Sequence, residues 1–151
     1  MRPILAFIMA VILSMTAIAQ TQPSTAPSLI SASDKAALDA AMNQEVTVEG
    51  VVAQAQWSRS GKVMNIDFRD ADQSGLLAVI FERNRAEMDA AFGGDVARSL
   101  TGSKVRIKGV LKPYGGRDEK LKGRPQIIIT RGDQITIVEP SQTAAAATQP
   151  K

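Results

Sequence analysis

The middle of the chain alternates between apolar and polar positions in the way that β-strands do. From residue 45 to residue 81, three such runs follow one another and are separated by two turns that each contain Gly. The runs are expected as strands at 45–57, 63–69 and 76–81. In the second run Met64, Ile66 and Phe68 share one face, because successive side chains of a strand point to opposite sides. Gly50 interrupts the first run, and we expect a bulge or sharp bend there.

The second half of the chain adds a helix and two more strands. Residues 84–92 carry apolar side chains at helical spacing and are followed by a Gly-Gly pair that stops a helix. Residues 104–112 alternate cleanly, with Lys and Arg at the outward positions. A Gly-rich basic loop at 114–124 follows, and the last strand is expected in two pieces at 126–130 and 134–139. The order is three strands, a helix and two strands, which predicts a small barrel closed by its fifth strand.

The N-terminus has the pattern of a targeting segment. Arg2 precedes an uncharged apolar run over 4–19, which ends in the small-x-small tripeptide Ala17-Ile18-Ala19. This pattern predicts a signal peptide over 1–19 and cleavage before Gln20. We therefore expect an exported protein, periplasmic or secreted, with no stable membrane span after cleavage; an uncleaved anchor is the alternative.

Both ends outside the barrel have compositions that do not favour a packed core. Residues 20–32 are expected to be a flexible linker, and residues 140–151 a disordered tail. The folded domain is expected over 33–139. It begins with an accessory helix over 34–42, for which Ser33 is the expected N-cap.

Composition removes most catalytic classes. The chain has 0 Cys and 0 His, so thiol chemistry, disulfides and the commonest general base and metal ligand are absent. We expect a protein that is not an enzyme and has no cofactor or metal. Nuclease chemistry on Asp67, Asp70, Asp72 and Glu82 is a weak alternative, since no calcium loop with its closing Glu is present.

Charge is distributed unevenly along the chain. The formal net charge is +3, but residues 98–131 hold ten Lys and Arg against only Asp118 and Glu119. Such asymmetry can mark an anion-binding face. The alternative is that these lysines and arginines only keep exposed strand positions soluble.

Several motifs resemble a known class of domain. They are V-T-V-E-G-V-V from Val46, S-G-K-V-M-N-I-D-F-R-D from Ser60, and G-L-L-A-V-I-F from Gly75. L-T-G-S-K-V-R-I-K-G-V-L from Leu100 fits the fourth strand. Together they resemble the oligonucleotide/oligosaccharide-binding (OB) domain of the anticodon-binding type. Relatives occur in class II aminoacyl-tRNA synthetases, the replicative DNA polymerase alpha subunit and the large subunit of exonuclease VII.

The resemblance implies a mainly β protein. The fold would be a five-stranded OB-fold Greek-key barrel with a helix between strands three and four and an N-terminal accessory helix. It also implies binding of a single strand across strands two and three, enclosed by the loops at 58–62 and 114–124. The binding residues implied are Trp57, Arg59, Lys62, Asn65, Arg69, Tyr114, Arg117, Lys120, Lys122 and Arg124.

Within this set, the arginines and lysines of the two loops are expected to contact phosphates. Asn65 stands where the synthetase-like pattern usually has a stacking aromatic residue, and Trp57 or Tyr114 is expected to replace it. Trp57 could instead cover the barrel end, and Tyr114 could close the core. The phenylalanines at 68, 81 and 92 are expected in the core.

The predicted function is that of a non-catalytic binding module for single-stranded DNA or RNA, or for another polyanion. The alternative is an envelope interaction domain that binds a protein or an anionic glycan through the same barrel face. Steep salt dependence and little sequence preference would distinguish the first.

Overall fold

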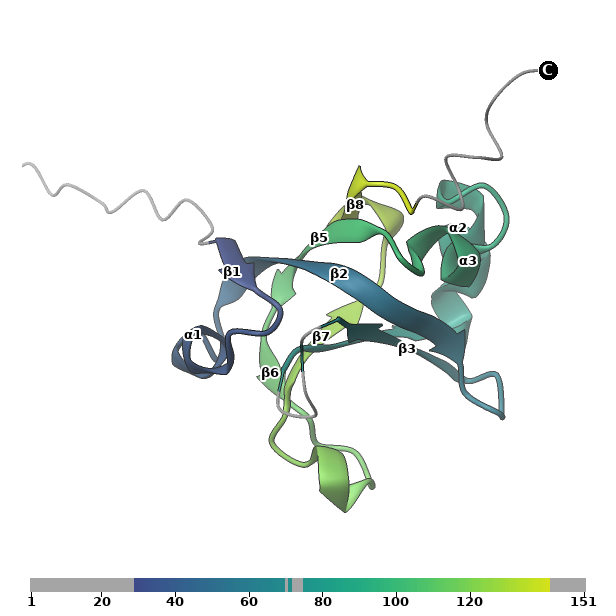
Figure 1. The fold of residues 1–151 in the computed structure, drawn as a ribbon. Helices are drawn as coiled ribbons and strands as arrows, with labels where there is room; N and C mark the ends of the chain where they lie inside the picture. Colours follow the sequence, from purple (N-terminus) through teal and green to yellow (C-terminus); the bar gives the residue numbers. More distant parts are fainter. Residues whose placement is uncertain (1–28, 70, 72–74, 142–151) are drawn as a thin grey trace, which may run out of the picture.

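The computed structural model describes residues 29–69, 71 and 75–141 (Figure 1). The predicted signal peptide over 1–19 and most of the predicted linker and tail lie outside these residues. The strands are β1 (Leu29–Ser31), β2 (Glu45–Trp57), β3 (Val63–Phe68), β4 (Leu77–Phe81), β5 (Lys104–Val110), β6 (Lys112–Pro113), β7 (Pro125–Ile129) and β8 (Ile135–Glu139). The helices are α1 (Lys35–Ala40), α2 (Arg85–Ala91) and α3 (Val96–Leu100), with short 3-10 turns η1 (Glu82–Asn84), η2 (Glu119–Leu121) and η3 (Gly132–Gln134).

The strands form one curled sheet in the order β6-β7-β4-β3-β2-β5-β8, with β1 added in parallel beside β2. β2 is long enough to pair with β5 through its first half and with β3 through its second half. β4 and β7 are parallel, whereas β5 and β8 are antiparallel. Because β7 and β8 are one strand interrupted by η3, this is the five-stranded OB arrangement. The predicted mainly β OB fold is confirmed.

The bend in β2 is produced at two places. The register between β2 and β3 shifts between Val52 and Gln54, two residues beyond the predicted bulge position. Gly50 instead allows a close approach, because a Cβ there would lie 2.7 Å from the Phe68 ring and 2.8 Å from Ala32. The Gly is therefore required by packing between β2, β3 and the segment after β1.

Alternating side chains of β2, β3 and β5 fill the interior, as the sequence predicted. The fully buried residues of these strands include Val46, Val48, Val52, Met64, Ile66, Val105 and Ile107. Helices α2 and α3 connect β4 to β5, and Met88, Val96 and Leu100 extend the core beneath them. Figure 1 shows these two helices on one side of the barrel and α1 with β1 on the other.

The N-terminal region differs from the prediction. Residues 29–32 were expected as the end of a flexible linker, but Leu29–Ser31 form β1 and Ala32 lies in the core. Helix α1 is shorter than expected, and its N-cap is Asp34 rather than Ser33. The Asp34 carboxylate accepts a hydrogen bond of 3.0 Å from the backbone N–H of Ala37.

The C-terminal boundary also lies slightly later than expected. Ser141 is buried, and its backbone N–H donates to the Ser103 hydroxyl over 3.0 Å. The chain is therefore held against the barrel beyond residue 140. Among the helices in the described residues, none is long and apolar enough to cross a membrane.

Candidate nucleic-acid interface

A groove of about 430 Å³ lies on the outer face of β3, β4 and β7, beneath the 114–124 loop. We call it the first groove. The strands contribute Val63, Asn65, Val79, Phe81 and Gln126, and the loop contributes Tyr114, Gly115, Gly116, Asp118 and Leu121. It lies where the sequence placed the binding surface, on strands two and three of the barrel. The predicted residues Asn65 and Tyr114 both line it.

The 114–124 loop is fixed at its base. The Tyr114 N–H donates to the Arg124 carbonyl over 2.8 Å, and the Gly123 N–H donates to the Tyr114 carbonyl over 3.2 Å. Within the loop, the Asp118 carboxylate accepts a bond of 3.0 Å from the Lys120 N–H and begins η2. These hydrogen bonds hold the loop over the sheet, although η2 is the only helical turn within it and is three residues long.

Arg124 is part of this support and not an exposed phosphate contact. Only 9% of the residue is exposed. Its Nε donates to the Gly75 carbonyl over 2.7 Å, and its Nη2 donates to the Leu76 carbonyl over 3.2 Å. The guanidinium also lies 3.8 Å from the Asp67 carboxylate. The prediction that Arg124 contacts phosphate is therefore not supported, because its donors already join the loop to the start of β4.

Two aromatic side chains face the first groove. Tyr114 lies against Gly116, where any Cβ would overlap the tyrosine ring. Phe81 was expected in the core, but the inward residues of β4 are Ala78 and Ile80, preceded by the inward Leu76. Phe81 is therefore on the outer face, half-buried and lining the groove. The resemblance would place a stacking aromatic residue at position 65 on β3. The structure instead has Phe81 on the neighbouring strand β4, on the same face as Asn65.

Trp57 is not in the first groove. It continues the inward side of β2, packs against the edge of the core, and is covered by Arg85, whose guanidinium carbon lies 4.8 Å from the ring centre. The position agrees with the alternative that Trp57 covers the barrel end. Of the remaining phenylalanines, Phe68 is buried in the core and Phe92 packs partly against it.

The other predicted cations differ in whether they have an acidic partner and in where they lie. Arg59, Lys62, Arg117 and Lys120 are exposed and form no ion pair with any residue that the structure describes. Lys122 is paired with Glu119 over 3.3 Å. Arg69 is exposed but lies away from the first groove, in hollows beside Val51 and Lys104 near β1. The structure thus keeps four of the predicted cations as candidates for phosphate contact.

The basic residues of β5 differ from those of the loops, because acidic residues of neighbouring strands pair with them. Arg106 lies directly opposite Glu49 on β2, with Nε 2.7 Å from the carboxylate. Lys104 reaches Glu49 over 3.1 Å and Glu139 of β8 over 3.5 Å. Lys108 lies 3.7 Å from Glu45. We call this set the β5 ladder.

Pairing within the β5 ladder changes the titration of its members. The hydrogen bond from Arg106, followed by that from Lys104, lowers the pKa of Glu49. The hydrogen bond to Glu49 raises the pKa of Lys104. Both shifts favour the charged forms, so this part of the basic segment is already neutralised by the protein itself.

Sequence reasoning missed the apolar part of the first groove, above all Val79, Phe81 and Leu121. The run from Leu76 to Phe81 is apolar throughout, so alternation could not separate its two faces. An uninterrupted apolar strand beside the alternating β3 was the available signal, since it indicates that the outer face is also covered or used.

Comparisons with known proteins agree with this architecture. No family model and no curated protein sequence matches the chain. Among solved structures, an aspartyl-tRNA synthetase from Entamoeba histolytica is 17% identical over 93% of this chain, with a TM-score of 0.52. An asparaginyl-tRNA synthetase from the same organism, in complex with asparaginyl-adenylate, is 18% identical over 83%, with a TM-score of 0.51.

A chain from Leishmania major Friedlin that is assigned to aspartyl-tRNA synthetase is 14% identical over 83% of this chain, with a TM-score of 0.53. The chain spans only 23% to 29% of the length of these three proteins. At such identities the likeness shows a shared fold. The predicted resemblance to an OB domain of the class II aminoacyl-tRNA synthetase type is therefore confirmed for the fold, through structures of aspartyl- and asparaginyl-tRNA synthetases.

Proposed function

We propose that this protein is a non-catalytic module that binds single-stranded nucleic acid, with RNA as the first candidate, in the first groove. The observation that carries the proposal is the pair of aromatic side chains, Phe81 and Tyr114, that line one groove on the outer face of an OB barrel. OB folds bind oligonucleotides and oligosaccharides on this face, between these loops. RNA comes first because the similar structures are named as tRNA synthetases.

The groove residues would divide the work of binding by their chemistry. Tyr114 and Phe81 offer π-faces to bases, and each such contact is worth about 1–3 kcal/mol. Arg83 lies over one face of the Phe81 ring, with its guanidinium carbon 5.3 Å from the ring centre, so the other face would receive the base. The amides of Asn65 and Gln126, on β3 and β7, can donate to and accept from base edges. The exposed loop cations Arg59, Lys62, Arg117 and Lys120 would track the phosphates on either side.

The test is fluorescence anisotropy of labelled oligouridylate and oligothymidylate with the purified protein, at low and at moderate salt. We expect salt-sensitive binding to both. Tyr114→Ala should weaken it by about 5- to 150-fold, which is the loss of one stacking contact. Tyr114→Phe keeps the ring and serves as the matched control, with affinity close to that of the wild type.

Absence of binding at low salt, where screening is weakest, would overturn the proposal. The alternative of a protein or anionic-glycan partner would then be tested by capture from the cell envelope. Binding that Tyr114→Ala leaves unchanged would reject the first groove as the site.

Export is a separate proposal, which rests on the composition of residues 1–19. Mass spectrometry of the protein purified from its native cell should find a mature N-terminus at Gln20. A chain that retains Met1 or Arg2 would contradict cleavage.

A further inference from the structure

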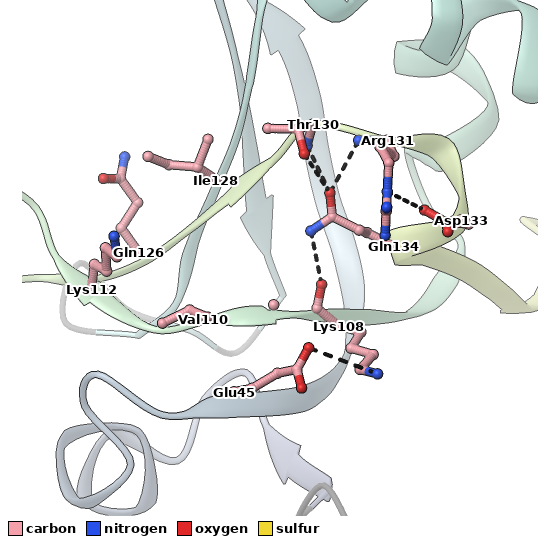
Figure 2. Close-up of a pocket in the computed structure, with 11 residues that line it drawn as sticks. Glu45, Lys108, Val110, Lys112, Gln126, Ile128, Thr130, Arg131, Asp133 and Gln134 are labelled. Atoms are coloured by element: carbon pink, nitrogen blue, oxygen red, sulfur yellow. Dashed lines mark hydrogen bonds and ion pairs between the residues drawn. The ribbon is translucent and has the colours of Figure 1, made fainter.

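A second groove, of about 490 Å³, lies on the outside of the barrel between β5 and β7 (Figure 2). At one end β5 continues into β6, where Lys112 pairs with Gln126 of β7. From there the two strands diverge. The floor is closed by packing, since a Cβ on Gly109 of β5 would lie 2.6 Å from Ile127 of β7. The groove is thus a bounded trough between two strands.

Gln134 closes the other end of the second groove. Its Nε2 donates to the Lys108 carbonyl on β5 over 3.1 Å. Its Oε1 accepts from the Thr130 N–H over 2.8 Å and from the Arg131 N–H over 3.0 Å. Figure 2 shows this amide between the two strands. The Gln134 side chain therefore takes the place of backbone hydrogen bonds between β5 and β7 at this point, and it holds the walls of the groove at a fixed spacing.

The walls of the second groove combine apolar and cationic side chains. Val110 is 43% exposed and Ile128 is 37% exposed, and both are among the few large apolar residues of the described chain that remain so accessible. Lys108 and Arg131 are on the rim, but Glu45 and Asp133 pair with them. Lys112 is also on the rim, is exposed, and has no acidic partner among residues 29–69, 71 and 75–141.

The two grooves meet at Gln126, which lines both of them. We propose that the second groove is a distal subsite of the same nucleic-acid-binding surface, so that a strand held in the first groove crosses β7 at Gln126 and continues between β5 and β7. There Lys112, the unpaired cation of the rim, contacts a phosphate. Val110 and Ile128 contact the apolar faces of sugar or base. This inference rests on the proposed function.

The inference makes affinity depend on oligonucleotide length. We would measure anisotropy with labelled oligouridylates of about four and about twelve nucleotides, which both lie within the range of site sizes for single OB folds. The shorter probe should occupy the first groove alone, and the longer probe should bind more tightly. The variant Lys112→Ala should weaken the longer probe by about tenfold, and its salt slope should fall by about 0.7 for the one lost contact.

Matched controls separate a local contact from a general loss of charge. Arg98→Ala removes an exposed cation from α3, which lines neither groove, and should leave both probes unchanged. Ile128→Thr keeps a β-branched residue on β7 and should weaken the longer probe only. Circular dichroism melting checks that each variant is folded.

The outcomes distinguish the two proposals. If neither probe binds at low salt, the proposed function itself fails. If the shorter probe binds and the longer one binds no better, the distal subsite is rejected. An unchanged affinity of the longer probe for Lys112→Ala would reject it too, and would leave Val110 and Ile128 as a surface for a protein.

Discussion

Two regions of this barrel are rich in Lys and Arg, but only one of them has acidic partners for most of its cations. On β5, Lys104, Arg106 and Lys108 each lie within 3.7 Å of an acidic side chain of β2 or β8. In the two loops, Lys62, Arg117 and Lys120 are exposed and pair with no residue that the structure describes. The register of β2 against β5 creates this difference, because it sets Glu49 opposite Arg106. Charge along a sequence becomes available to a ligand only where the fold provides no partner.

The comparison also concerns aromatic residues. The first groove, beside the loops, presents Phe81 and Tyr114, whereas the outer positions of β5 are charged apart from Val110. A binding surface needs both charge and stacking if it is to hold a single strand. Only the loop region offers both among the described residues.

The largest effect is expected from removing both aromatic rings. Phe81→Leu/Tyr114→Leu keeps apolar bulk in the first groove but abolishes stacking. We expect at least about thirtyfold weaker binding of a labelled oligouridylate, from two contacts of about 1 kcal/mol or more each. Trp57→Leu is the control, since Trp57 does not line the first groove, and binding should stay unchanged. A strong loss with Trp57→Leu would mean that the wrong face has been assigned.

An intermediate effect is expected at Arg124, which belongs to the basic loop by sequence but is buried. Arg124→Ala leaves the Gly75 and Leu76 carbonyls without its two hydrogen bonds. The free energy of unfolding should fall by about 1–3 kcal/mol, as for other buried groups that lose a partner. Urea unfolding measures it.

The matched variant for Arg124 is Lys120→Ala, in the same loop. Lys120 is exposed, and its side chain has no ion-pair partner among the described residues. Stability should therefore be unchanged. Equal stability of the two variants would contradict the structural role of Arg124.

The smallest effect is expected from the β5 ladder, and it depends on pH. The pKa of Glu49 is lowered below its usual 4.5. The contribution of Glu49 to the free energy of unfolding is therefore present above pH 4.5 and is lost as pH falls through the folded-state pKa. Glu49→Gln should lower the melting temperature slightly at pH 7, because exposed pairs contribute little. At pH 3 the difference from the wild type should be smaller. A constant difference at both pH values would show that the carboxylate charge is not the cause.

The fold was predictable where alternation was unambiguous. In β2, β3 and β5, polar outward positions alternate with buried ones, and the inward residues were assigned correctly. Two short elements, β1 and α3, were not predicted, because each carries too few residues to show a period. β1 also lies at the end of a segment whose composition is typical of linkers.

The candidate site was predictable only in part. The loops and Tyr114 follow from the element order, but the outward direction of Phe81 does not, since every residue from 76 to 81 is apolar. The role of Arg124 depends on two carbonyls nearly fifty residues earlier in the chain. Likewise, the pairing of the β5 cations depends on strand register, which the spacing of charges alone does not determine.

The measurement that tests the central claim most directly compares two triple variants. Lys62→Gln/Arg117→Gln/Lys120→Gln removes the loop cations, and Lys104→Gln/Arg106→Gln/Lys108→Gln removes the same residue types from β5. Both lower the formal net charge of +3 by three. The salt dependence of oligouridylate binding is measured for each. The account predicts that the slope falls by about 2 for the loop variant, from about 0.7 per lost phosphate contact, and stays unchanged for the β5 variant. Equal losses of slope in both variants would contradict it.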